Sequence, residues 1–220
     1  MIELIRSIGW TLCHGFVYTV LLSIISLIFA LLVGLIGGII RAEKVPFLER
    51  VVFSYVYVAR ATPFPMILFT VYFVLPAFGI QLSNIQTAII CLVFHSGGYI
   101  TEIIRRSIQS ITKGQREAAM ALGMNSYQRL RLVILPQALR VMLPPLAGQL
   151  ILLVKDTSVI SLIGVTEVTR VARQMMQTIY QPLGILALTA IFYFIVCYPL
   201  GLYSSYAERR LLSKGFGNLN

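Results

Sequence analysis

The residues best placed to do chemistry interrupt a run of otherwise apolar residues. Four polar residues break the apolar run over about residues 142–163, namely Lys155, Asp156, Thr157 and Ser158. A charged side chain in an apolar membrane helix is costly and normally faces a protein interior or a water-filled cavity. Lys155 is therefore a candidate to meet the carboxylate of a solute, and Asp156 or the later Glu167 to meet its amino group. The alternative is that Lys155 and Asp156 neutralise neighbouring charges across a helix bundle.

No arrangement typical of catalysis or metal binding accompanies these residues. The sequence has no GxxxxGK[ST] motif, so we do not expect the chain to cradle ATP phosphates itself. His14 and His95 lie in no metal-binding motif, and we expect both to be packed or interfacial. The cysteines have no close spacing that would indicate a disulfide or metal framework. We therefore expect no enzyme, no metal and no cofactor bound by this chain.

The composition indicates an integral membrane protein. Of the 220 residues, 58% are hydrophobic and 12% charged, whereas soluble domains have about 45–50% apolar and about 25% charged residues. Too few polar side chains remain to cover a soluble globule. The 18 Lys and Arg outnumber the 8 Asp and Glu. In a membrane protein this excess indicates basic cytoplasmic loops, and we expect no nucleic-acid partner.

The apolar runs predict an all-α protein with five transmembrane helices in a single domain over residues 1–220. A span needs about 20 residues, and the predicted spans cover about 16–40, 62–78, 87–104, 142–163 and 183–206.

Local residues refine these spans. The 41 residues between Arg60 and Glu102 carry no formal charge, and "GIQLSNIQ" divides them into two spans. Thr62 is expected to cap the second span, which has prolines in its first turn. Gly34 and Gly38 share one face of the first span and would allow another helix to approach closely.

Basic residues predict the orientation of the spans. Segment 41–60 holds four Lys or Arg, segment 105–140 holds seven, and the tail after 207 holds three. With five spans these 14 residues fall on one side, which the positive-inside rule makes cytoplasmic. The predicted N-terminus lies outside and the C-terminus in the cytoplasm. Near the inner end of the third span, Glu102 is expected to pair with Arg105 and Arg106 on one helix face.

The longest predicted cytoplasmic loop, about 112–136, contains signals for two short helices. Thr112 and Gln115 fit a capping box for a helix over about 114–122. Gly123 would end that helix, because glycine readily adopts the left-handed conformation.

The second helix of this loop is expected to begin after Asn125, with Gln128 completing another capping box. Pro136 is expected to end or bend that helix. The small residues of the first helix are expected to form a surface that a partner can approach closely. They are Ala118, Ala119 and Ala121.

This loop resembles the EAA loop of permease subunits in bacterial ABC importers. The resemblance rests on "EAAMALG" and "VILP" at the family's spacing. The matching residues are Glu117, Ala118, Ala119, Gly123, Leu135 and Pro136, with Val133 in place of an isoleucine. In that family the loop forms a coupling helix that docks on a separate ATPase. With Gln115, these residues are the expected ATPase interface. The alternative is a basic amphipathic loop on anionic lipid.

Further segments are similar to the polar amino-acid branch of that family. They are "ARATP" (59–63), "GYITEIIRRSIQSITKGQREAA" (98–119) and "KDTSVISLIGVTEVTR" (155–170). The sequence departs from the pattern at Ile67, at Gly148, at Arg106 and at Ala61, which replaces a glycine.

The resemblance implies a multi-pass protein of the bacterial inner membrane that moves a polar amino acid. Implied partners are an ABC ATPase dimer holding ATP and Mg, a second identical or homologous permease, an external solute-binding protein, and membrane lipid. The remaining alternative is a secondary transporter or channel driven by an ion gradient.

Overall fold

The computed structural model describes residues 2–212, and every regular element among them is helical. The α-helices are α1 (Ile2–Ala42), α2 (Leu48–Ala61), α3 (Phe64–Val74), α4 (Asn84–Gln109), α5 (Lys113–Ala121), α6 (Ser126–Gln128), α7 (Leu135–Ile160), α8 (Val168–Ile179) and α9 (Pro182–Leu212). Shorter helical turns follow α3, α6 and α7, at Leu75–Phe78, Arg129–Ile134 and Ser161–Ile163. The predicted all-α fold is confirmed for these residues.

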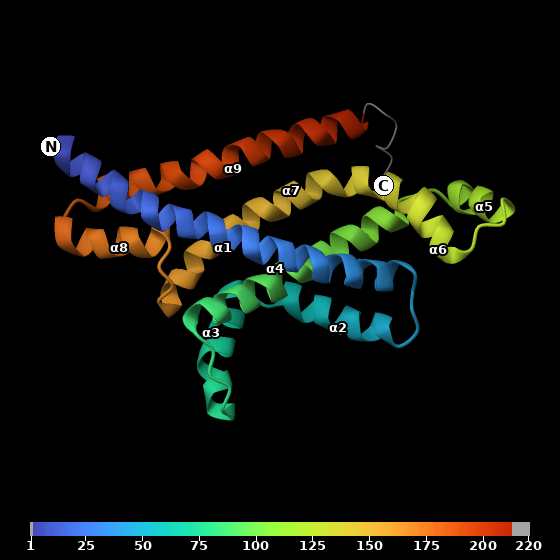
Figure 1. Cartoon of the computed structure of the whole chain (residues 1–220), viewed down its shortest axis with the longest axis horizontal. Coiled ribbons are helices and arrows are strands. Elements are labelled where there is room, and N and C mark those ends of the chain that lie inside the picture. The colour runs from blue at the N-terminus through green and yellow to red at the C-terminus, as the bar shows by residue number, and fades with distance from the viewer. Residues whose placement is uncertain (1, 213–220) are drawn as a thin grey trace.

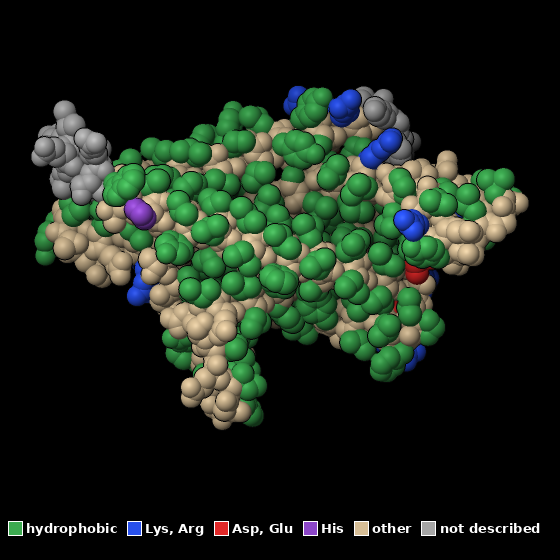
Figure 2. Space-filling model, viewed as in Figure 1, with side chains coloured by type: hydrophobic (Ala, Val, Ile, Leu, Met, Phe, Trp, Pro, Cys, Tyr) green, Lys and Arg blue, Asp and Glu red, His purple; other side chains and the backbone are tan. Residues whose placement is uncertain are grey.

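Four long helices form the body of the molecule. Figure 1 shows α1, α4, α7 and α9 running along its long axis, with α3 projecting from one side. These four, with α7 extended by its flanking turns, are long and apolar enough to cross a membrane, and the pair formed by α2 and α3 adds a fifth candidate span. Hydrophobic side chains cover most of the visible face (Figure 2), as expected where lipid replaces water.

Close packing of α1 against α4 confirms the prediction for the two glycines. A Cβ atom on Gly38 would lie 2.6 Å from Cγ2 of Ile104, and one on Gly34 would lie 2.8 Å from Cβ of Ile100. Only glycine lets the backbones approach this closely. Ile100 and Ile104 are both buried in the core between α1, α4 and α7.

The helix of the second predicted span begins at Phe64, close to its expected start, but a sharp break joins it to α2 and Thr62 does not cap it. The bend between α2 and α3 is 105°. Thr62 ends α2 with an extended backbone, and Pro63 precedes α3 without a side-chain cap. A residue before proline is disfavoured in the helical region, which explains the break at Thr62. Segment 41–60 is thus largely a helix rather than a loop.

The fourth predicted span begins earlier than expected. Residues from Ser126 to Ile163 form one continuous candidate span. The helix that begins after Asn125 therefore does not end at Pro136. Pro136 falls at the start of α7, directly after a wider π-type turn over Arg129–Ile134. The wider hydrogen bonding of this turn accommodates the proline, which has no N–H to donate to the fourth residue before it.

Helix α8 was not predicted. Its buried residues Val168, Val171 and Ala172 follow helical spacing and face a small core with Leu12 and Ile185. A Cβ atom on Gly15 of α1 would lie 2.8 Å from Cγ2 of Val171. The helix lies at the end of the molecule opposite α5 and α6 (Figure 1).

Candidate functional site

The EAA-like loop lies at one end of the molecule. Figure 1 shows α5 and α6 together beyond the ends of α1 and α2. The side chain of Arg116 anchors α5 to the body, because it donates to the carbonyl oxygen of Ile108 at 2.9 Å. It also lies 3.5 Å from Glu43, just after α1. A hydrogen bond of 3.3 Å from Gln137 to Gln115 joins α5 to α7. The loop therefore has few but specific attachments to the bundle.

The capping of α5 differs from the prediction at its start and agrees at its end. Thr112 precedes α5 but makes no side-chain capping bond, so the predicted box with Gln115 is wrong. Gln115 is instead engaged with Gln137. Gly123 has a φ of 74°, in the left-handed region, and its N–H donates to Met120 at 2.9 Å. This is a glycine-ended helix, as predicted.

The capping box of α6 is confirmed. Asn125 Oδ1 accepts from the backbone N–H of Gln128 at 2.9 Å, and Gln128 Oε1 accepts from that of Asn125 at 3.0 Å. Two otherwise unpaired donors are satisfied by this exchange. The box fixes where the chain re-enters the long helix that contains α7.

The exposed face of α5 is partly apolar. Glu117 and Ala118 are exposed, whereas Ala119 is 3% exposed and packs inward, so the expected alanine surface lacks that residue. Met120 and Leu122 are 51% and 77% exposed. These two residues were not among the predicted interface residues, although large apolar side chains beside the EAA pattern were a visible signal in the sequence. Exposed apolar groups at a protruding, otherwise polar loop are typical of a protein-binding surface.

The remaining interface candidates lie where the loop joins α7. Val133 and Leu135 are partly buried, and Leu135 packs against the core between α1, α4 and α7. Pro136 is exposed. These three residues therefore form the base of the loop, while Glu117 and Ala118 lie on its outer helix.

The predicted polar residues of α7 are only partly brought together. Thr157 is fully buried and bonds back to the carbonyl oxygen of Val154, and Ser158 bonds to that of Lys155. Lys155 is exposed and Asp156 is partly exposed. Both hydroxyl groups thus bond within their own helix, and Lys155 is the member of the charged pair that faces outward.

Asp156 has a neighbour that the sequence analysis did not connect with it. His95 Nε2 on α4 lies 4.0 Å from Asp156 Oδ2. The other ring nitrogen, Nδ1, lies 3.0 Å from the carbonyl oxygen of Ala59, which can only accept. Nδ1 therefore carries the proton, and Nε2 turns towards the carboxylate. His95, in the middle of α4, joins the ends of α2 and α7 close to the break between α2 and α3.

Glu167 lies apart from this group and caps α8. Its carboxylate accepts from the backbone N–H groups of Thr169 at 2.9 Å and Arg170 at 2.6 Å. The Tyr193 hydroxyl donates to it at 3.1 Å. Burial raises the pKa of Glu167 above its ordinary value, and these hydrogen bonds oppose the shift. Glu167 is fully buried, so its acceptors are used by the protein.

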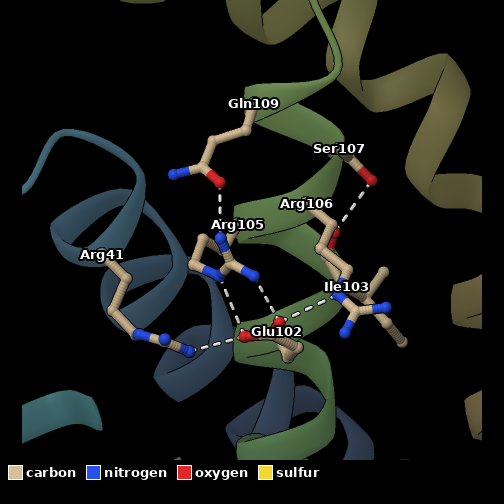
Figure 3. Close-up of polar contacts among 7 residues, drawn as sticks. All are labelled: Arg41, Glu102, Ile103, Arg105, Arg106, Ser107 and Gln109. Carbon is tan, nitrogen blue, oxygen red and sulfur yellow. Dashed lines mark hydrogen bonds and ion pairs between the residues drawn. The ribbon is translucent and has the colours of Figure 1, made fainter. Parts of the chain in front are cut away.

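A second buried carboxylate, Glu102, gathers three arginines (Figure 3). The predicted pairing with Arg105 and Arg106 on α4 is confirmed, at 2.5 Å and 2.9 Å. Arg41, from the end of α1, also reaches Glu102 at 2.5 Å. Sequence spacing gave no sign of Arg41, because it lies 61 positions away. The carboxylate of Glu102 can be buried because guanidinium groups neutralise its charge and donate hydrogen bonds to its oxygen atoms.

A line of polar and aromatic side chains connects the two clusters. A pocket of about 330 Å³ beside Glu102 is lined by Arg41, Phe53, Val56, Tyr57, Arg60, Ala61 and Glu102. The guanidinium of Arg60 lies 5.3 Å from the ring centre of Tyr99. The ring of Tyr99 lies 5.2 Å from that of His95, which faces Asp156. We call the set Arg41, Arg60, Tyr99, Glu102, His95 and Asp156 the polar track.

Comparison with known proteins identifies the family. Residues 30–213 match the family described as "Binding-protein-dependent transport system inner membrane component". The chain belongs to this family. It is a permease subunit of an importer of the ABC type and a multi-pass component of the inner membrane. This family membership replaces the alternative that the sequence left open, a secondary transporter or channel driven by an ion gradient.

Similar curated proteins are permeases of amino-acid transport systems. The chain is 39% identical over 211 residues to the L-cystine transport system permease TcyB of Bacillus subtilis, covering 95% of this chain and 90% of that protein. It is 37% identical over 202 residues to the glutamine transport system permease GlnP of Escherichia coli, covering 91% and 92%.

Solved structures show the same fold. A chain in the crystal structure of an amino acid ABC transporter with histidines has a TM-score of 0.86 and 29% identity. The match covers 96% of this chain and 98% of that chain. The MetNI methionine ABC transporter, at 23% identity and a TM-score of 0.78, supports the fold alone.

Proposed function

We propose that this chain forms one transmembrane domain that moves a polar amino acid inward, driven by a separate ATPase. The relatives named for cystine and glutamine support the substrate class. The single observation that carries the coupling is the EAA-like loop, which protrudes from the body and exposes Glu117, Met120 and Leu122. In this proposal ATP and Mg are held by the partner, and this chain catalyses no reaction.

We further propose five spans with the N-terminus outside and α5 and α6 in the cytoplasm. Lys and Arg side chains lie mostly towards the end that carries α5 and α6 (Figure 2), which favours this orientation. The count treats α2 and α3 as one bent span. Arg60 does not lie at the cytoplasmic end of α2. It is close to the opposite end of this 14-residue helix, about 20 Å from the end nearest to α5 and α6. Without Arg60, 13 of the 18 Lys and Arg residues remain in the segments that the positive-inside rule assigns to the cytoplasm.

The part of the polar track from Arg60 to Asp156 is the proposed route for the substrate through this subunit, while Arg41 and Glu102 hold its end together. Lys155, Asp156, Thr157 and Ser158 remain candidates, and we add His95 and Arg60 because of their contacts. Glu167 is a weaker candidate, since its carboxylate already accepts hydrogen bonds from α8 and Tyr193. A second permease would complete the pathway, and an external solute-binding protein would deliver the amino acid.

Two substitutions in the loop test the coupling. Gly123→Pro removes the N–H that ends α5 and forbids the left-handed backbone. Glu117→Lys reverses an exposed charge. We expect either variant to lower ATP-driven uptake by about tenfold or more while the permease still inserts in the membrane. ATP hydrolysis by the partner should persist, no longer tied to uptake.

The control for these variants is Thr178→Ala on α8, at the opposite end of the molecule. It removes an exposed side chain that bonds only to the carbonyl oxygen of Gln174. Uptake by this variant should match that of the parent protein. Normal uptake by both loop variants, at equal amounts of inserted protein, would contradict the coupling proposal.

A further inference from the structure

The ends of α7 and α9 enclose a pocket that the transport route does not use. Its volume is about 290 Å³. Its lining includes Arg140, Leu143, Tyr203, Tyr206, Arg210 and Leu211. Figure 2 shows Lys and Arg side chains gathered near the C-terminal end of α9, which runs beside α7. This pocket is separate from the polar track, whose residues lie on α1, α2, α4 and the second half of α7.

Helical spacing brings the lining residues to facing sides of the two helices. Tyr203, Tyr206 and Arg210 are three, four and seven positions apart and share one face of α9. The Ser204 hydroxyl donates to the carbonyl oxygen of Pro144 at 3.0 Å, which holds α9 against α7 beside the pocket. The walls of the pocket are therefore tied together by a bond within the protein.

Polarity changes along the pocket in one direction. Arg140 precedes Leu143 on α7, and Arg210 follows Tyr203 on α9. Because these helices run antiparallel, both arginines lie at the same end. Tyr203 lies seven residues from Arg210, which is about 10 Å deeper along the span. The pocket thus has two guanidinium groups at one end, next to Leu211, and has Leu143 and the phenol ring of Tyr203 farther along the two helices.

The charges of the lining favour an anion. Among the described residues, none that lines the pocket is Asp or Glu, although Glu208 lies nearby on α9. Guanidinium groups bind phosphate oxygens through paired, charge-assisted hydrogen bonds. Tyrosines are enriched where a span meets the polar headgroups. Basic pockets between transmembrane helices on the cytoplasmic side bind anionic lipid headgroups.

We propose that this pocket binds the headgroup of an anionic phospholipid of the phosphatidylglycerol type from the cytoplasmic leaflet. Arg140 and Arg210 hold the phosphate, and an acyl chain follows Leu143 and Tyr203 into the membrane. The proposal rests on the orientation proposed above. It does not depend on which amino acid the permease moves, nor on contact between the loop and an ATPase.

Lipid retention by the purified complex tests the proposal without substrate or ATP. The complex is reconstituted in nanodiscs of phosphatidylcholine mixed with phosphatidylglycerol, then analysed by native mass spectrometry for bound lipid. We expect Arg140→Gln and Arg210→Gln each to lower retained phosphatidylglycerol about fivefold. Arg209→Gln is the matched control, because it removes the same charge from α9 outside the pocket lining and should retain the lipid.

Thermal unfolding in the same nanodiscs gives a second measurement. Phosphatidylglycerol should raise the midpoint of the parent protein and of Arg209→Gln more than that of either pocket variant. An equal loss of this stabilisation in all three variants would mean that the lipid is attracted by general surface charge, and would overturn the proposal. So would equal stabilisation by inorganic phosphate in pure phosphatidylcholine, which would indicate a soluble anion. Altered permease pairing with unchanged lipid retention would assign this face to a second copy instead.

Discussion

Two glutamates 15 positions apart in the chain, Glu102 and Glu117, have opposite environments. Glu102 is 7% exposed and is bonded by three arginines from α1 and α4. Glu117 on α5 is exposed, and no hydrogen bond or ion pair to its side chain occurs among the described residues. Arginines lie near both carboxylates in sequence. Burial, rather than residue type, separates a structural ion cluster from a surface available to a partner.

This difference has an energetic basis. A buried carboxylate must be neutralised by opposite charges and satisfied by hydrogen bonds. Removing one partner leaves the remaining buried charge uncompensated. An exposed charge is solvated by water and contributes little to stability. Glu117 therefore has no folding role that would explain its place at the tip of the molecule, which favours a role in contact with another protein.

The largest expected effect on stability follows from breaking the buried cluster. Glu102→Ala leaves Arg41 buried without its partner and should lower the free energy of unfolding by about 3–5 kcal/mol. The matched change Glu117→Ala should alter it by less than about 0.5 kcal/mol. Thermal unfolding of both variants in detergent measures the contrast, and similar losses in the two would contradict it.

A smaller effect is expected from separating the helices that bring Arg41 to Glu102. Gly38→Ala places a methyl group 2.6 Å from Cγ2 of Ile104, and overpacking of this kind should cost about 1–3 kcal/mol. Gly148→Ala on α7 is the control, because nothing lies within 4 Å of its Cβ position. It should be neutral or stabilising in the same unfolding assay. Equal stability of Gly38→Ala and the parent would show that α1 and α4 are not in close contact.

The smallest effect concerns Glu167, a buried glutamate whose carboxylate is bonded by backbone N–H groups and a tyrosine hydroxyl, with no guanidinium paired to it among the described residues. Its pKa is raised above the ordinary value of 4.5 in the folded protein, so the folded state binds the proton more tightly. Stability from this group is fully present below about pH 4.5 and is lost as the pH rises through the raised pKa. Unfolding midpoints of the parent, relative to Glu167→Gln, should therefore fall as the pH rises over this range. A relative rise would reverse the assigned shift.

The sequence was sufficient for the parts of the fold that depend on neighbouring residues. Uncharged runs predicted the long helices, and glycine spacing predicted the contact between α1 and α4. The ends of local elements at Gly123 and Asn125 were also predicted correctly, because such signals lie within a few residues of the helix they end or begin.

Features that depend on distant contacts were missed. Arg41 meets Glu102 across 61 positions, and His95 meets Asp156 across a similar separation, so neither pair has a local signature. At the sharp bend after α2, the sequence predicted only the start of a span. A proline can mark either the start of a helix or a break between two helices, so the residue type did not distinguish the two. Thr112 has the right partner for a capping box, but Gln115 is drawn to Gln137 by packing against α7. Helix α8 was within reach, since its apolar residues follow helical spacing.

Photocrosslinking of the loop to the ATPase tests the central claim most directly. A photoreactive residue replacing Ala118, which is exposed on α5, is compared with one replacing Tyr180, which is 87% exposed at the opposite end of the molecule. In assembled complexes, we expect a crosslink to the ATPase subunit from position 118 and none from position 180. An ATPase crosslink from position 180 without one from position 118 would contradict it.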